Sequence, residues 1–169
     1  QPDLPPAQRD ALAPLQAAAR LMAQAVDALL LLAREPQTGA APPPVPVLPL
    51  LEDWVLAHAE ALDAQGLPVR LDLKPGDALA LPAPVLQTVL AGLLGNALVH
   101  ARHGGSIRVE READGALRLC NPVAPPGQPR PWSGLGLGLA IVGRLLERHG
   151  GTLDWRRDDQ EACARVRGP

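Results

Sequence analysis

Three glycines stand at alternate positions, Gly134, Gly136 and Gly138, directly before a stretch with the pattern of an amphipathic helix. Glycine has no Cβ atom, so a loop rich in glycine lets backbone N–H groups approach an anion closely. The N-terminus of the helix that follows adds a favourable dipole. Gly150 and Gly151 end that helix. The spacing therefore predicts a phosphate-binding loop followed by a helix.

Two familiar phosphate motifs do not match this loop. A Walker loop ends in Gly-Lys-Ser/Thr, and no lysine follows any of these glycines. The dinucleotide fingerprint G-x-G-x-x-G directly follows a strand, whereas here Leu139 takes the place of the third glycine and residues 129–133 are Pro-Arg-Pro-Trp-Ser. The alternative is that the glycines form only a flexible lead-in to the helix, because glycine commonly punctuates structure.

Two asparagines upstream could complete a site with this loop. Asn96 lies inside an otherwise apolar helical stretch, where a buried amide costs free energy unless it is bonded. It is either a core hydrogen-bonding group or a hard oxygen ligand for a cation that accompanies phosphates. Asn121 ends a strand-like segment, where it either starts a turn or accepts a hydrogen bond from a ligand's amino group.

The composition restricts the class of protein. The length of 169 residues fits one domain, or one domain plus a short accessory element. The chain is 47% hydrophobic with three Trp and no Phe or Tyr, so Leu, Val, Ile and Ala must fill the core. The formal net charge is −2 without a long basic run, which argues against general affinity for nucleic acid. The longest apolar run, residues 28–33, is too short to span a bilayer.

The two cysteines, Cys120 and Cys163, lie in alternating, strand-like sequence. Their spacing matches no metal motif and does not suggest a disulfide framework. We interpret them as buried free thiols of a protein in a reducing compartment. The chain begins with Gln1 rather than Met, and we expect it to be a fragment of a longer protein.

Residues 1–35 and 50–169 differ in character, and a proline-rich stretch over 36–49 divides them as a semi-rigid, extended linker. The first segment predicts a helix with a heptad seam, which needs a partner, either the downstream domain or a second copy of the chain. Pro14 lies in the first turn of this helix or kinks it. The seam consists of Leu12, Leu15, Ala19, Met22, Val26, Leu29 and Ala33.

The elements after the linker alternate between helical and strand patterns. The sequence predicts a helix over 50–65 that stops at Gly66, a strand over 68–73 and an apolar helix over 84–102. A hairpin over 106–120 follows, and a closing hairpin over 152–166 comes after the glycine motif and its helix. This order predicts an α+β sandwich with a largely antiparallel sheet.

Taken together, the apolar helix with L-L-G-N-A-L-V-H, the strand end L-C-N-P and the motif G-L-G-L-G-L-A-I-V resemble the ATP-binding catalytic domain of bacterial sensor histidine kinases. That domain belongs to the ATPase superfamily of DNA gyrase, the heat-shock chaperones and MutL. The resemblance covers about residues 50–168. It implies a two-layer α/β sandwich of the Bergerat type, with a mixed, mostly antiparallel sheet under helices, preceded by one long dimerisation helix.

The resemblance also implies a binding site for ATP and Mg²⁺. Asn96 would bind the magnesium ion, and Asn121 stands where an Asp usually accepts from the adenine amino group. Arg130 could reach a terminal phosphate from the proline-rich lid over 122–133. The residues implied to bind ATP are Asn96, His100, Asn121, Gly134, Gly136, Gly138 and Leu139.

The front segment resembles the second helix of the family's dimerisation and phosphotransfer hairpin, which implies a homodimer through residues 9–34. We expect the phosphoacceptor histidine to lie outside this fragment. The alternative is that residues 9–15 form a degenerate acceptor box with Arg9 in the histidine position. Of the four histidines, His100 and His103 flank the implied site, and we expect His58 and His149 at the surface.

The family's activity would be transfer of the γ-phosphoryl group of ATP to a histidine and then to an aspartate of a response regulator receiver domain. The fragment would be the cytoplasmic portion of an inner-membrane sensor protein. Two alternatives remain. One is a degenerate, dimerising regulatory module without kinase activity, which is favoured by three departures from the family pattern: Asn121, Gly92 and the short lid. The other is an ATPase of the gyrase type, and the absence of a carboxylate at Gly92 in this chain argues against it.

Overall fold

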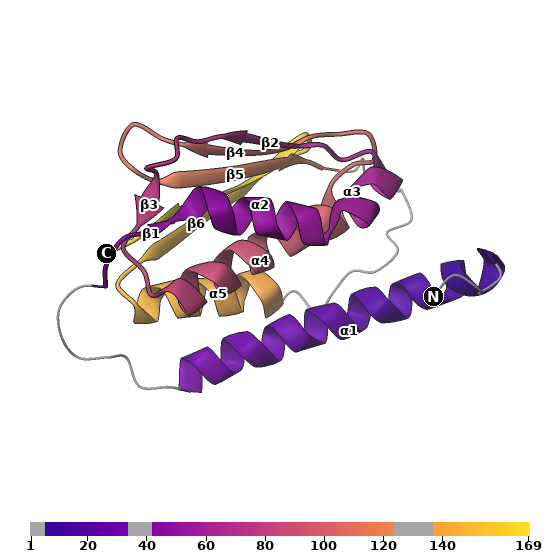
Figure 1. Ribbon diagram of the computed structural model, residues 1–169, viewed down its shortest axis with the longest axis horizontal. Coiled ribbons are helices and arrows are strands. Elements are labelled where there is room, and N and C mark those ends of the chain that lie inside the picture. Colours follow the sequence, from indigo (N-terminus) through magenta and orange to yellow (C-terminus); the bar gives the residue numbers. More distant parts are fainter. Residues whose placement is uncertain (1–5, 34–41, 124–136) are drawn as a thin grey trace.

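The computed structural model describes residues 6–33, 42–123 and 137–169. A five-stranded sheet forms one layer and helices cover one of its faces, with the long first helix farthest from the sheet (Figure 1). This arrangement is an α+β sandwich, as the order of the sequence patterns predicts.

The large sheet is mixed, with the strand order β2-β4-β5-β7-β6. Only the β2–β4 pair is parallel, and the other three pairs are antiparallel. The prediction of a mixed, mostly antiparallel sheet is therefore confirmed. Its strands are β2 (Val69–Asp72), β4 (Ile107–Arg111), β5 (Leu117–Pro122), β6 (Thr152–Arg157) and β7 (Glu161–Arg167).

Each strand alternates between apolar and polar residues, so the two faces of the sheet differ. On β5 and β7 the residues that face the helices are Leu117, Leu119 and Asn121, and Ala162, Ala164 and Val166, and all of them are buried. Period-two alternation places the intervening residues on the opposite face. The described core consists of aliphatic side chains with Trp54 as its one large aromatic, as the composition requires.

Two helices form where one is predicted over residues 50–65. Helix α2 (Val47–Ala57) ends at His58, and α3 (Ala59–Gln65) ends at Gly66, whose φ of 59° is the left-handed conformation that suits a glycine stop. Residues 45–49, which the composition assigns to the linker, belong to the fold. They form strand β1 (Val45–Pro46), which pairs with β3 (Ala78–Leu79), and the first turn of α2, where proline is tolerated.

Helix α4 (Ala83–His100) lies in the centre of the helical layer and contacts α1, α2, α5 and β5. By length and composition alone it is apolar enough to cross a membrane. Eight of its residues are buried in the core, and this burial accounts for its apolar character. Helix α5 (Leu137–Arg148) packs beside it.

Helix α1 (Pro6–Ala33) is continuous through Pro14, so the helix does not begin at that proline. Its C-terminal part contacts α4 and α5 through Ala28, which is buried, and through Leu31 and Leu32. The heptad seam lies largely away from the domain, and only its residue Leu29 lines a hollow beside α5. All seven seam residues are exposed, among them Leu15 at 65%, Met22 at 67% and Val26 at 53%.

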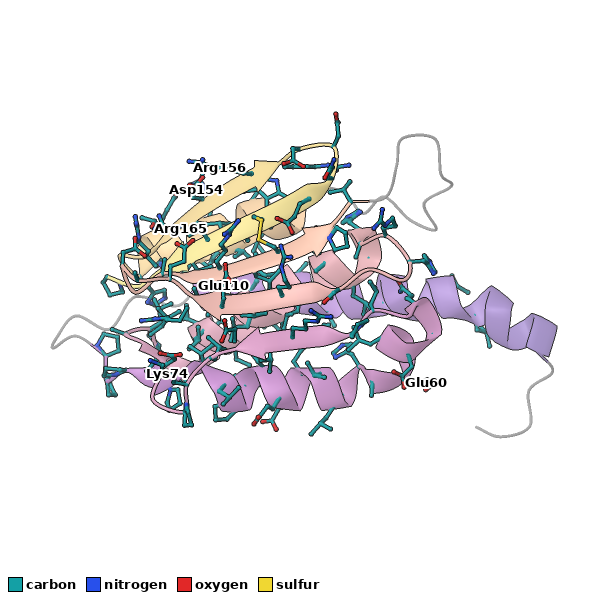
Figure 2. The ribbon with its side chains drawn as sticks, turned by 90° about the horizontal axis from the view of Figure 1, so that it is seen from above. Glu60, Lys74, Glu110, Asp154, Arg156 and Arg165 are labelled. Atoms are coloured by element: carbon teal, nitrogen blue, oxygen red, sulfur yellow. A yellow bond between two sulfur atoms is a disulfide. The ribbon has the colours of Figure 1, made fainter. Side chains whose placement is uncertain are left out.

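The open face of the sheet, which none of the described helices covers, carries ion pairs (Figure 2). Arg165 pairs with Glu112 and Asp114, and Arg167 also pairs with Asp114. The hydrogen bond from Arg167 is the main reason that the pKa of Asp114 falls to about 2. Farther along, Arg108 pairs with Glu161, and Arg118 lies 3.3 Å from Glu110.

Cys120 and Cys163 are joined by a disulfide on this open face, so the interpretation of free thiols is wrong. The two residues are register partners on β5 and β7, and their Cα atoms lie 4.2 Å apart. That separation is within reach of a disulfide between antiparallel neighbours. The sequence separation of 43 residues gives no hint of this contact, because the pairing of β5 with β7 creates it.

Candidate functional site

One cavity of about 170 Å³ brings four of the predicted site residues together. It opens between the C-terminal half of α4, the ends of β5 and β6, and the starts of β7 and α5. Asn96, His100, Asn121 and Leu139 line it, together with Val123, Trp155, Arg157 and Ala162. The described part of the chain therefore places residues from five separate elements around one hollow.

Helix geometry explains how two of these residues share the cavity. Asn96 and His100 are four residues apart on α4, and residues at this spacing lie on the same helix face. Both side chains are half-buried, in contrast to the fully buried leucines on the core side of the same helix. The carboxamide oxygen of Asn96 is a hard ligand of the kind that Mg²⁺ accepts.

Asn121 is the single polar side chain among the described buried residues, with 1% of its surface exposed. Its Nδ2 donates to the Pro122 carbonyl at 3.3 Å, which orients the amide. Its Oδ1 is buried and has no hydrogen-bond partner among the described residues. Because a buried polar atom costs free energy unless it is bonded, this oxygen is an unsatisfied acceptor on a side chain that lines the cavity.

Backbone hydrogen bonds hold the rim of the cavity in place. The Arg102 N–H donates to the Pro122 carbonyl at 2.9 Å, which ties the end of α4 to the end of β5. The Val123 N–H donates to the Gln160 carbonyl at 2.8 Å, which ties β5 to the turn before β7. In that turn the N–H groups of Glu161 and Gln160 donate to Asp158 and lower the pKa of its carboxyl.

Glycine at position 105 allows the loop after α4 to approach this rim. A Cβ atom there would lie 2.3 Å from Pro122 Cγ and 2.9 Å from the Arg102 carbonyl oxygen. No side chain fits at those distances. The close approach keeps the α4–β4 connection against the end of β5, directly beside Asn121.

The four other lining residues were not predicted from the sequence. Ala162 is the register partner of both Asn121 on β5 and Arg157 on β6, so the three form one row across the sheet. Trp155 lies one alternation earlier on the same face of β6 and is half-buried. The alternation of Leu153, Trp155 and Arg157 in the sequence predicts that these side chains share one face of a strand. Only the strand register shows that this face lies beside Asn121.

The glycine motif is only partly described. Gly138 is exposed in the first turn of α5, next to the cavity residue Leu139. Gly134, Gly136 and Arg130 lie outside the described residues. Farther along the α4–α5 interface, a Cβ atom at Gly92 would lie 2.7 Å from Val142 Cγ2, so the missing side chain allows close packing of the two helices.

Two histidines differ from expectation. His58 is half-buried because its ring stacks on Trp54 with 4.0 Å between centroids, and its Nδ1 lies 2.8 Å from the Trp54 carbonyl oxygen. His149 is also half-buried, and burial followed by the charge of Arg148 lowers its pKa. His103 is exposed and is not among the residues that line the cavity, whereas His100 lines it.

Two other features carry none of the predicted site residues. A larger hollow of about 610 Å³ lies between α1 and α5, lined by Leu29, Leu32, Ala140, Ile141, Arg144, Glu147 and Arg148.

On the open face, the possible ligand atoms of Cys120, Cys163 and Glu161 lie within 4.8 Å of one another. The disulfide leaves neither sulfur available as a thiolate, so this cluster is not a metal site in the oxidised form.

Comparison with known proteins agrees with the architecture. The chain is 31% identical over 122 residues to the sensor protein KdpD of Escherichia coli, and it spans 14% of that protein's length. No protein-family model matches the chain. The cytoplasmic segment of the histidine kinase QseC superimposes with a TM-score of 0.64 at 20% identity, covering 91% of this chain and 93% of that one.

A further structure, full-length ShkA in complex with AMPPNP, superimposes with a TM-score of 0.61 at 22% identity and covers 99% of this chain and 40% of that chain. The fold is that of the catalytic, ATP-binding domain of sensor histidine kinases, the class that the sequence motifs resemble. The KdpD match, over 60% of this chain, is to a protein described as a sensor protein.

Proposed function

We propose that this chain is the ATP-binding, catalytic part of a two-component sensor histidine kinase, on the cytoplasmic side of an inner-membrane sensor protein. The observation that carries the proposal is the cavity in which Asn96, His100, Asn121 and Leu139 meet. These residues come from the three motifs that carry the family resemblance. That a related fold is known with AMPPNP bound supports ATP as the ligand.

In the proposed complex each wall of the cavity has a separate task. The free Oδ1 of Asn121 accepts from the amino group of adenine, and the bond from its Nδ2 to Pro122 keeps the oxygen on the cavity side. Asn96 would hold Mg²⁺, which would neutralise phosphate charge. Backbone amides of Gly134, Gly136 and Gly138 and the guanidinium of Arg130 would contact the phosphates.

The α4 helix carries no carboxylate at position 92 that could activate water in the manner of a gyrase-type ATPase. Gly92 has none, and the 2.7 Å approach to Val142 leaves no room for one without displacing that side chain. An imidazole acceptor is nucleophilic without a base, so this arrangement favours transfer to histidine over the hydrolysis of a gyrase-type ATPase. The acceptor histidine would lie on a dimerisation hairpin outside this chain, and a response regulator receiver domain would take the phosphoryl group next.

Helix α1 supports the proposed homodimer through residues 9–34. Its contacts with the domain use Ala28, Leu31 and Leu32, whereas the heptad seam is exposed. A solvent-exposed apolar seam on a long helix is the surface that a four-helix bundle buries. Residues 1–35 would therefore serve dimerisation and the rest of the chain nucleotide binding, with residues 36–44 as the linker.

The alternative function is a dimerising regulatory module that has lost kinase activity, and the neutral Asn121 in place of a carboxylate favours it. The two functions separate in a binding experiment with a fluorescent ATP analogue and Mg²⁺. We expect the wild-type fragment to bind below millimolar concentration. Absence of binding at millimolar concentration would exclude the kinase.

The same experiment tests the site through Asn96→Ala. We expect this variant to keep its fold and to lose at least tenfold in Mg²⁺-dependent affinity, because the proposed metal ligand is gone. Gln87→Ala, an exposed amide on the same helix, is the matched control and should bind like the wild type. Unchanged binding by Asn96→Ala would show that the site assignment is wrong.

A further inference from the structure

We propose that Cys120 and Cys163 form a reversible dithiol–disulfide site, exchanging with small-molecule thiols and disulfides, and that its redox state sets the nucleotide affinity of the cavity behind it. The claim that the redox state sets nucleotide affinity rests on the proposed function. The claim that the two cysteines exchange reversibly depends only on the geometry of the open face of the sheet.

The pair lies where solutes can reach it. Among the described residues, the helices cover the opposite face of the sheet, and the disulfide is visible between the central strands when the open face is viewed (Figure 2). The two sulfurs differ in access, because Cys163 is half-buried and Cys120 is only 3% exposed. Exchange with a small molecule should therefore occur at Cys163, with Cys120 as its inner partner.

Charged neighbours surround the accessible sulfur. Arg118 Nη2 lies 3.7 Å from Cys163 Sγ, and a guanidinium beside sulfur favours the thiolate, which is the nucleophilic form. A carboxylate oxygen of Glu161 lies 3.3 Å from the same sulfur and can accept a hydrogen bond from the Cys163 S–H group in the reduced state. The charge of that carboxylate is offset by its ion pair with Arg108.

The exchange balances without another reactant. The Cys163 thiolate attacks one sulfur of a small disulfide such as oxidised glutathione, which forms a mixed disulfide and releases one thiolate. Cys120 then attacks Cys163 Sγ, the mixed S–S bond breaks, and the second thiolate leaves. Two protons pass from the protein thiols to the two released thiolates, and the two electrons reduce the small disulfide. Reduction follows the same steps in reverse.

The disulfide lies directly behind the wall of the cavity. Asn121 follows Cys120 and Ala162 precedes Cys163, and both point to the opposite face, where they line the cavity. One row across the sheet is therefore Asn121, Ala162 and Arg157, and the adjacent row is Cys120, Cys163 and Arg156. The covalent bond fixes β5 against β7 at the position where the Asn121 acceptor must be held.

These observations give a direction for the coupling. A cross-link that holds two strands in one register pre-organises the wall and reduces the ordering cost of binding. We expect the oxidised form to bind nucleotide at least fivefold more tightly than the reduced form. In a cytoplasmic protein, where the proposed function places this chain, disulfides are usually transient or redox-sensing, so both forms would be populated.

The test equilibrates the fragment in buffers of different reduced-to-oxidised glutathione ratio. Alkylation followed by mass measurement gives the disulfide fraction, and titration with a fluorescent ATP analogue and Mg²⁺ gives the affinity of each form. We expect a two-electron transition within the accessible range of ratios, and a matching fall in affinity on reduction. The double variant Cys120→Ser/Cys163→Ser should bind like the reduced wild type at every ratio.

Three results would overturn the inference: thiols that stay unpaired at every ratio, a disulfide that resists full reduction by dithiothreitol in the folded protein, or equal affinities of the two forms. Reduced wild-type protein replaces the double variant if that variant does not fold. If neither form binds nucleotide, the proposed function fails by itself. Hydrogen exchange then decides the coupling, since reduction should speed exchange in peptides over 117–123 and 161–166, and unchanged exchange would reject it.

Discussion

The two faces of the same three strands carry opposite chemistry. On β5, β7 and β6 the row Asn121–Ala162–Arg157 lines the cavity, and the adjacent row Cys120–Cys163–Arg156 lies on the open face. Among the described residues, one face leaves a buried acceptor without a partner, whereas the other forms ion pairs and links its sulfurs. The unsatisfied acceptor lies on the face that we propose binds nucleotide, and the ion pairs and the disulfide lie on the face that connects the strands.

The largest expected effect is a difference in stability between two variants of β5, one on the face that packs in the core and one on the open face. Leu119→Ala removes a side chain that is 2% exposed, and deletion of a buried leucine costs about 2–5 kcal/mol in free energy of unfolding. Arg118→Ala, its neighbour on the open face, should cost less than about 1 kcal/mol because exposed ion pairs contribute little. Urea unfolding measures both, and equal losses would contradict the distinction.

A second variant, Asn121→Leu, tests whether the unsatisfied amide on the inner face lowers the stability of the fold while it contributes to ATP binding. Asn121→Leu removes the unpartnered buried Oδ1, and the free energy of unfolding should rise by about 1 kcal/mol. Affinity for ATP should fall by about two- to tenfold, since a net hydrogen bond contributes roughly 0.5–1.5 kcal/mol. Urea unfolding and nucleotide titration give the two values, with the exposed Gln87→Ala as the control for binding. A variant that is less stable and binds normally would show a structural role only.

The smallest effect lies on the open face and depends on pH. The pKa of Asp114 is lowered to about 2, chiefly by Arg167, so its ion pairs stabilise the folded state above the ordinary carboxyl pKa near 4. That contribution should be lost as the pH falls from about 4 to 2. Asp114→Asn should lower the urea midpoint at pH 5 and approach the wild type at pH 2. Asp63→Asn, at an exposed position on α3, is the control. If the urea midpoint of Asp114→Asn stays as far below that of the wild type at pH 2 as at pH 5, the ion pairs of Asp114 are not the cause.

Much of the fold could be predicted from local patterns. Alternation in 69–72, 107–111 and 152–157 follows from one face of each strand being buried, and Gly66 stops a helix because of its left-handed backbone. The two-residue strands β1 and β3 were missed because two residues carry no periodicity. The start of α2 was missed because its first turn contains proline.

The candidate site was predictable where a polar residue interrupts an apolar run. Asn96 and Asn121 stand out for this reason, and the structure brings them to one cavity. Trp155 and Arg157 could not be assigned, because their place depends on β7 lying between β5 and β6. The disulfide was missed for the same reason, since only the register sets Cys120 opposite Cys163.

The most direct test of the central claim is hydrogen exchange of the fragment with and without ATP and Mg²⁺. A nucleotide in the proposed cavity should slow exchange in the C-terminal half of α4 around Asn96–His100 and at the end of β5 around Asn121–Val123, and it should leave the outer helix α1 unchanged. Protection confined to the hollow between α1 and α5, or no protection at millimolar ATP, would contradict the assignment of this cavity as an ATP site.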